Sequence, residues 1–172
     1  MKPEFTPAQA GGGVRWDCGK LYVEHSHRRD ANTVARFMRS ADSAEVSAVT
    51  KQPPVRVLVD GINGSKPCFT IKRVFDGKPC GIFGATEGDH TGSGLVWMLG
   101  TNDLTSNWRS FLRFSRPFIE ELHKHYGFLY NVIDARNTVH IRWLERMGFT
   151  LGKVIPEWGI ERRKFIYFSK TA

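Results

Sequence analysis

The sequence predicts a single domain of the α/β (α+β) class, in which a mixed central sheet has helices on both faces. Segments with strand character alternate along the chain with segments of helical spacing. A hairpin signal is followed by a nearly continuous apolar run over 94–100, which is typical of a strand covered on both faces. The length of 172 residues suits one buried core. This order of elements excludes an all-β sandwich and a helix bundle.

The first half of the chain is predicted to contain a tail, one helix and several strands. Residues 1–13, which end in three glycines, are expected to form a flexible tail before a domain over 14–172. A single helix is predicted over 30–49, because apolar residues recur there at helical spacing and Pro53 and Pro54 follow. The strands expected in this half are 21–23, 55–59, 68–75 and 80–85.

The second half is predicted to contain two helices among the remaining strands. A long amphipathic helix is expected over 106–126, with a kink or break at Pro117. A short helix is expected over 138–147, capped by Asn137 and closed by Gly148. The strands expected in this half are 94–100, 128–133, 151–155 and 164–168.

The charge of the chain indicates a polyanionic ligand. A net charge of +8 and a pI near 9.7 attract nucleic acid, an anionic membrane face or a phosphorylated cofactor. The alternative is that the excess of lysine and arginine only keeps the protein soluble. No stretch approaches the roughly 18 consecutive apolar residues of a membrane span, so none is expected.

Cysteine and histidine usage gives little sign of a metal site. The three cysteines are far apart, lack zinc-ligand spacing and fit a reducing compartment. His25 and His27 form a short H-x-H pair that shares one face of a strand, but no third ligand is near in sequence, so surface histidines are expected. Residues 1–13 lack the apolar core of a signal peptide, which predicts a chain that stays in the cytoplasm at synthesis.

A resemblance to a known fold lies in residues 131–149, NVIDARNTVHIRWLERMGF. Asn137 opens a helix directly after a buried strand, and the helix ends in Gly148 and Phe149. This arrangement resembles the second half of the GNAT (acyl-CoA N-acetyltransferase) fold. The hairpin, the apolar strand and the long helix upstream are similar to the acyl-CoA half of the same fold.

A more specific resemblance covers about residues 20–168. Four blocks resemble, in order and spacing, the short-tailed bacteriophage family described as internal virion protein A. They are FMRSADSAE from Phe37, WMLGT from Trp97, FLRFSRPF from Phe111, and Asn137 through Phe149. The resemblance implies a phage protein made in the host cytoplasm and associated with the virion, with virion or host proteins as partners.

The GNAT resemblance implies an acetyl-CoA site at a V-shaped opening between two parallel strands. The residues that correspond to cofactor contacts are Met98, Leu99, Gly100, Thr101, Arg109, Ser110 and Arg113. The last three lie where the following helix begins, and free N–H groups at a helix start stabilise phosphates. Asp134 and Asn137 follow the second strand and are the candidate catalytic residues, since a nearby base must take the proton of the attacking amine.

The sequence departs from the GNAT pattern in two places. Residues 101–108 contain no glycine where the family has a glycine-rich phosphate loop, and Asp103 adds a negative charge there. Leu144 stands seven residues after Asn137, at the position of the tyrosine that acts as general acid. Arg109, Arg113 and Arg116 share one helix face and are candidates to bind the phosphates instead, or to form a solvated basic face.

Three hypotheses follow. The first is a phage GNAT-fold protein of virion assembly or early infection that binds acetyl-CoA with weak or lost catalysis. The second is an active N-acetyltransferase that modifies a host protein or a small amine. The third is a non-catalytic basic module that binds a partner or nucleic acid.

Overall fold

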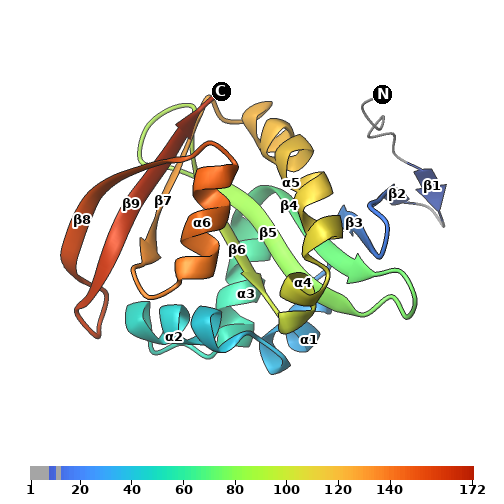
Figure 1. Cartoon of the computed structure of the whole chain (residues 1–172), viewed down its shortest axis with the longest axis horizontal. Helices are drawn as coiled ribbons and strands as arrows, with labels where there is room; N and C mark the ends of the chain where they lie inside the picture. The colour runs from blue at the N-terminus through green and yellow to red at the C-terminus, as the bar shows by residue number, and fades with distance from the viewer. Residues whose placement is uncertain (1–7, 11–12) are drawn as a thin grey trace.

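The computed structural model describes residues 8–10 and 13–172, whose strands form one mixed sheet (Figure 1). The strands are β1 (Ala8–Ala10), β2 (Gly13–Asp17), β3 (Leu21–His25), β4 (Ser65–Arg73), β5 (Pro79–Glu87), β6 (Ser93–Gly100), β7 (Phe128–Asp134), β8 (Thr150–Trp158) and β9 (Arg163–Thr171). The helices are α1 (Asp30–Arg36), α2 (Ser40–Val49), α3 (Pro54–Gly64), α4 (Asn102–Ser106), α5 (Trp108–His123) and α6 (Thr138–Arg146).

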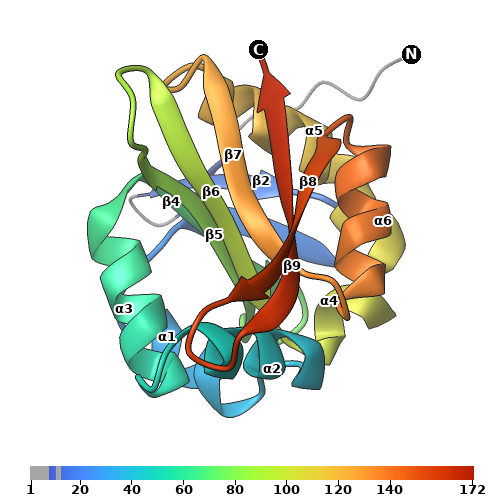
Figure 2. The ribbon, with the colours of Figure 1, turned by 90° about the vertical axis from the view of Figure 1, so that its left-hand side faces the viewer.

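The sheet has the order β1-β2-β3-β4-β5-β6-β7-β9-β8 in the described part of the chain. Its strands pair antiparallel, except that β6 and β7 pair parallel. Figure 2 shows α5 and α6 on one face of the sheet and α3 on the other, with α1, α2 and α4 grouped at one end. The predicted mixed sheet with helices on both faces is confirmed.

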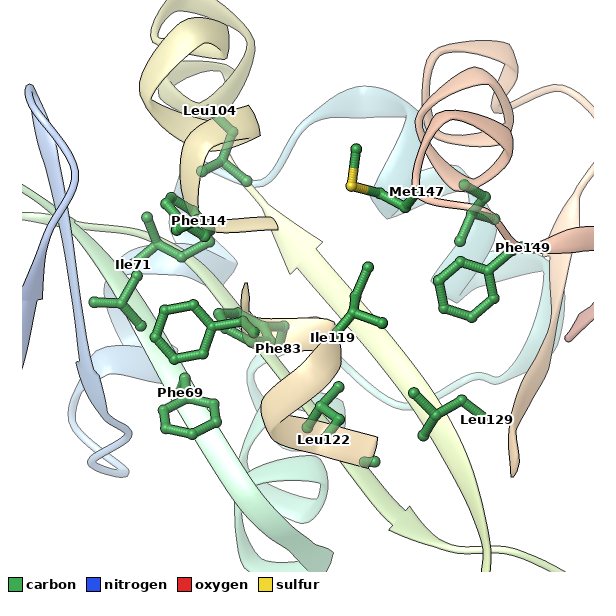
Figure 3. Packing of buried hydrophobic residues seen from close by; sticks show 14 of the residues in the cluster. Phe69, Ile71, Phe83, Leu104, Phe114, Ile119, Leu122, Leu129, Met147 and Phe149 are labelled. Carbon is green, nitrogen blue, oxygen red and sulfur yellow. The ribbon is translucent and has the colours of Figure 1, made fainter. Parts of the chain in front are cut away.

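Two hydrophobic clusters hold the helices to the sheet. The larger one joins β4, β5 and β7 to α5 and α6, and Figure 3 shows Phe69, Phe83, Phe114 and Leu129 within it. The smaller one lies under α1 and α3 and includes Ala31, Val34, Leu58, Cys68 and Ile82. Burial of both faces explains the apolar sequence of β5, whereas residues 95–99 of β6 are only half-buried.

The helix predicted over 30–49 is wrong in one respect, because it is two helices. The chain leaves α1 after Arg36 and starts α2 at Ser40. Between them Met38 forms an antiparallel bridge to Thr101, and the Arg39 N–H donates to the Gly100 carbonyl at 2.9 Å. This long-range pairing with the end of β6 takes the backbone out of the helix.

The strand predicted over 55–59 is also wrong, because these residues lie in α3. Pro54 occupies the first turn of α3, where its fixed φ and missing N–H favour a helix start. Val55, Leu58, Val59 and Ile62 recur at helical spacing and pack in the smaller cluster. Burial of this face outweighs the strand preference of the valines.

Two predictions about helix ends and kinks need correction. The helix α5 runs through Pro117 without the break that was one of the two expectations, and Phe114 and Phe118 on either side of it pack in the same core. A kink at Pro117 stays a prediction. Its start lies at Trp108, and 102–106 form the separate helix α4. Asn137 stands at the start of α6 but makes no side-chain capping hydrogen bond.

The remaining elements agree with the predictions. The hairpin β4–β5, the strands β6 and β7, the helix α6 and the terminal pair β8–β9 all form, and Gly148 after α6 has a φ of 85°. The predicted tail over 1–13 lies largely outside the described residues, and Ala8–Ala10 pairs with Gly13–Asp17. No helix within 8–10 and 13–172 is long and apolar enough to cross a membrane.

Candidate functional site

The parallel strands β6 and β7 separate into a V-shaped opening. They pair only where Ser93, Gly94 and Leu95 meet Phe128, Leu129 and Tyr130. Beyond that point β6 stays paired to β5 as far as Gly100, while β7 stays paired to β9 as far as Asp134. At the point of separation the Asn131 Nδ2 donates to the Val96 carbonyl at 2.9 Å.

The opening exposes one backbone donor and one backbone acceptor of β6. Alternate residues of a strand direct their N–H and C=O to the same edge, so Val96, Met98 and Gly100 share the edge that faces β7. Val96 accepts from Asn131, and Gly100 donates to Asp42 Oδ2 at 2.8 Å and accepts from the Arg39 N–H. Met98 between them keeps its N–H and C=O directed into the opening.

Two cavities meet at this opening. The larger, of about 360 Å³, reaches from α2 and α3 on one side of the sheet to α5 and α6 on the other. The smaller, of about 240 Å³, lies between α4, the start of α5, and α6. The side chains that line both are Met98, Phe111, His140 and Trp143.

The smaller cavity has a net positive wall, because Arg39 and Asp42 in its lining pair with each other and leave two further arginines. Arg142 and Arg146 of α6 lie at its wall, are exposed, and form no ion pair with the described residues. The helix α5 begins beside it with no side-chain cap and no acidic residue in its first turn, so the positive end of its dipole lies beside this cavity without a negative side chain from that turn. Asp103, whose negative charge was expected from the sequence to disfavour phosphate binding, forms an ion pair with Arg73 at 3.1 Å.

The predicted cofactor-binding residues separate in the structure. Met98 lines both cavities, Leu99 lines the larger one, and Gly100 is bonded to α2 as described. The Thr101 hydroxyl accepts from the Asp103 N–H and caps α4. The Thr101 side chain therefore stabilises the start of α4.

The three predicted residues at the start of α5 line neither cavity. Ser110 Oγ accepts from the Lys20 N–H at 3.1 Å, and the Arg113 guanidinium lies against Gly19 in the same β2–β3 turn. The Arg109 guanidinium lies 5.1 Å from the ring centroid of Trp108. Arg116 instead donates to the Arg146 carbonyl, so the arginines do not act as one row. Their role toward a cofactor stays a prediction.

A carboxylate that the sequence did not single out lies in the larger cavity. Glu45 projects from α2 and lines that cavity. Its Oε2 accepts from Asn137 Nδ2 at 3.2 Å and from the Asp134 N–H at 3.4 Å. Burial, together with the nearby charges of Asp42 and Asp134, raises the pKa of Glu45 to about 7 against the lowering effect of these hydrogen bonds. Glu45 is therefore a base with a proton affinity matched to neutral pH.

The two predicted catalytic residues surround Glu45. Asp134 is 2% exposed, and burial favours a raised pKa, but hydrogen bonds from the Arg136 backbone and guanidinium outweigh burial and lower the pKa of Asp134. Asp134 lines neither cavity and is held as an ion pair. Asn137 donates to Asp42 Oδ1 at 3.4 Å and to Glu45, and its buried Oδ1 has no partner among the described residues. The geometry therefore gives both residues positioning roles.

Asp42 joins this carboxylate cluster to β6. It is 2% exposed, forms an ion pair with Arg39, and accepts from the Gly100 N–H. Arg39 directly precedes α2, and Asp42 and Glu45 lie three residues apart on α2, a spacing that places these two side chains on neighbouring turns of a helix. That spacing is the sequence signal that could have identified Glu45.

His140 is a titratable side chain of α6 near the position of the missing tyrosine. It lies one turn before Leu144 on α6, lines both cavities, and packs on Trp143 with ring centroids 5.3 Å apart. Burial lowers the pKa of His140 to about 4, so the imidazole is neutral at pH 7. A neutral imidazole keeps one N–H donor and one acceptor.

Metal and thiol chemistry find no support within the described ranges. No three histidine, cysteine or acidic side chains gather there to hold a metal, and His25 stacks on Phe69 with centroids 5.1 Å apart. Burial raises the pKa of Cys18 and Cys80 to about 12 and of Cys68 to about 11, which makes these thiols poor nucleophiles.

Comparison with known proteins gives the fold a name. No protein-family model and no curated protein sequence matches the chain. A GNAT-family acetyltransferase from Bacillus anthracis is similar in structure, with a TM-score of 0.66 and 11% identity over 91% of this chain and 98% of that one. The chain has the GNAT fold.

Two further proteins whose solved structures are similar to this chain are named as acetyltransferases of ribosomal proteins. The ribosomal-protein-S5-alanine acetyltransferase from Vibrio fischeri has a TM-score of 0.64 and 14% identity over 92% of this chain and 96% of that one. The ribosomal-protein-alanine N-acetyltransferase from Brucella melitensis has a TM-score of 0.65 and 13% identity over 87% and 99%. The GNAT-like opening between β6 and β7 is thus part of a fold shared over nearly the whole chain.

Proposed function

We propose that the chain is an N-acetyltransferase that uses acetyl-CoA and a primary amine, with Glu45 as the general base. The observation that carries the proposal is the opening between β6 and β7, where the free backbone of Met98 lies between an arginine-lined cavity and a carboxylate-bearing one. Acetyl-CoA needs phosphate contacts at one end and a strand edge along its amides, and the amine needs a base.

The residues of the smaller cavity fit acetyl-CoA. Arg142, Arg146 and the positive dipole end at the start of α5 would hold phosphates, and Phe111 and Trp143 offer an apolar wall. The Met98 N–H and C=O would pair with amide groups as a neighbouring strand does. Bound there, acetyl-CoA supplies an activated acyl thioester.

On the opposite side Glu45 would take the proton of the attacking amine. The Asn137 amide and the Asp134 N–H hold the carboxylate in place. Because its pKa lies near 7, a large fraction of Glu45 is ionised at neutral pH and able to accept a proton. His140, one turn before Leu144, would donate a hydrogen bond where the tyrosine of other GNAT proteins does.

The test is calorimetric titration of the full chain with acetyl-CoA, combined with an assay for thiol release in the presence of primary amines. We expect micromolar binding and amine-dependent release of CoA. Binding without release for any amine would leave a GNAT-fold acetyl-CoA-binding protein that lacks catalysis. No binding at millimolar acetyl-CoA would contradict the proposal and favour the basic partner-binding module.

We also propose a role in virion assembly or early infection, with virion or host proteins as partners. The resemblance of four sequence blocks to the phage internal virion protein family supports it, and three of those blocks supply Glu45, Met98 and Asn137 to the opening. Mass spectrometry of purified phage particles tests it, with the chain expected among the virion proteins. Its absence from the particles would contradict virion association.

A further inference from the structure

The side of the larger cavity that holds Glu45 has an apolar wall. Val46 and Val49 come from α2, Val57 from α3, Trp97 from β6 and Trp158 from the end of β8. Glu45 is the carboxylate among the described residues that line this cavity. The wall therefore combines one negative charge with branched and aromatic surface.

Trp97 forms a fixed part of this wall. Its indole N–H donates to Ser65 Oγ at 2.9 Å. Its ring lies over Gly61 of α3, where a Cβ atom would come within 2.6 Å of Trp97 Cζ2. The absence of a side chain at Gly61 therefore lets the ring lie back against α3 and leaves the cavity open.

The mouth of the cavity is also apolar. Val49 and Trp158, which line the cavity, are each 40% exposed, and Ile160 in the turn after Trp158 is 51% exposed. The turn between β8 and β9 is docked on α2, because the Glu161 N–H donates to the Ala48 carbonyl at 3.1 Å and Gly159 lies against the same carbonyl. Exposed apolar side chains gathered at the rim of a cavity mark a binding surface.

We propose that this side of the cavity binds a primary amine carried on an aromatic or branched apolar group. The inference rests on the proposed function, because Glu45 is the group that meets the amine. The ammonium pairs with the one carboxylate and the apolar body lies on Trp97 and the valines. A polyamine would place a second ammonium against apolar surface without a partner, which is strongly unfavourable.

The experiment is calorimetric titration of the full chain, without acetyl-CoA, with a series of linear alkylamines, 2-phenylethylamine and spermidine. We expect affinity to rise about fourfold for each added methylene until the wall is reached, as burial of apolar surface requires. 2-Phenylethylamine should bind at least about tenfold more tightly than spermidine. The Glu45→Gln variant should weaken the binding of 2-phenylethylamine but leave that of 2-phenylethanol unchanged.

Two glycines of α3 provide a matched pair of variants. Gly61→Ala should push the Trp97 ring into the cavity and weaken 2-phenylethylamine binding about tenfold, since one methyl group of overpacking disturbs a close-fitted wall. Gly64→Ala should leave binding unchanged, because its Cβ would meet Thr86 at an ordinary 3.4 Å. If Gly61→Ala fails to fold, Trp97→Phe, which removes the outer indole ring, should weaken binding of 2-phenylethylamine more than that of methylamine.

The outcomes separate this inference from the proposed function. The inference is overturned if affinity does not change along the alkylamine series, or if spermidine binds more tightly than 2-phenylethylamine. Acetyl transfer to spermidine would in that case leave the proposed function intact. Selective binding of 2-phenylethylamine supports the inference even when no acetyl group is transferred, a result that would contradict the proposed function alone.

Discussion

The two sides of the opening between β6 and β7 differ in charge and in polarity. On the side of α5 and α6, Arg142 and Arg146 lie at the wall of the smaller cavity and have no acidic partner among the described residues. On the side of α2 and α3, the wall is apolar and contains the single carboxylate of Glu45. The backbone of Met98 separates them.

This difference matches the opposite needs of the two reactants of an acetyl transfer. A phosphorylated donor gains from cations at an exposed rim, where arginine binds phosphate oxygens in pairs. An amine must lose a proton before it attacks, which requires a base that is partly shielded from water. One fold therefore supports two binding surfaces of different chemistry at one strand edge.

The largest expected effect is on the chemical step at Glu45. Glu45→Gln should lower kcat by about 10²–10⁴, the usual contribution of a general base, while the Kd for acetyl-CoA stays unchanged. In the unsubstituted protein kcat/KM should rise with pH through an apparent pKa near 7 and lose that inflection in the variant. The control is Glu120→Gln on the exposed face of α5, and equal loss in both variants would contradict the assignment.

A second effect at Glu45 concerns stability. Its pKa rises from an ordinary 4.5 to about 7 on folding, so the folded chain binds this proton more tightly than the unfolded chain. The ionisation of Glu45 therefore lowers the free energy of unfolding as the pH rises above about 4.5. This destabilisation reaches its full size above about pH 7. Glu45→Gln should raise the free energy of unfolding by about 2–3 kcal/mol at pH 8 and leave it nearly unchanged at pH 4. Urea unfolding at both pH values measures this, and an equal change at both would contradict it.

The third prediction concerns the basic side. Arg142→Ala with Arg146→Ala should raise the Kd for acetyl-CoA about tenfold, through lost charge-assisted hydrogen bonds, and leave 2-phenylethylamine binding unchanged. Arg109→Ala with Arg113→Ala should change the Kd less, because those side chains lie at Trp108 and at the β2–β3 turn. If calorimetric titrations show a larger rise in Kd for the Arg109→Ala/Arg113→Ala variant, the phosphates are bound by Arg109 and Arg113, as predicted from the sequence.

The smallest effect is expected at Asp103. Because Arg73 pairs with it at 3.1 Å, its charge is already balanced near the start of α5. Asp103→Asn should therefore change the Kd for acetyl-CoA by less than about threefold, in line with the small energies of partly exposed ion pairs. A tenfold gain in affinity in the same titration would show that Asp103 repels the phosphates directly.

Elements whose pattern is local were predictable. The hairpin of β4 and β5 follows from its turn residues, and α6 follows from helical spacing closed by Gly148. The segment of α3 was misread as a strand, since its valines favour strands and only the packing over Ile82 and Trp97 decides for a helix. The break before α2 was missed because it depends on Thr101 and Gly100, which are distant in sequence.

The sequence predicted which elements carry the candidate site, but not the role of each side chain in it. Met98 was expected on the strand over 94–100 and lies in β6, because that strand is evident from its apolar run, while its contact with a cofactor stays a prediction. Asp134 and Asn137 were placed at the end of β7, where they contact Glu45. Which of the three carboxylates is left without a cationic partner could not be read from spacing, since Arg136 pairs with Asp134 and Arg39 pairs with Asp42 only in the folded chain.

By itself the sequence determined the class of the fold, because strand alternation, helical periodicity and turn residues act over short distances. The position of the opening followed from the resemblance to the GNAT fold. The tertiary structure alone decided the chemistry on each side. The raised pKa of Glu45 arises from burial between α2, β7 and α6, which come from separate parts of the chain. The side chain of Trp97 lies flat because Gly61, from another element, leaves it room.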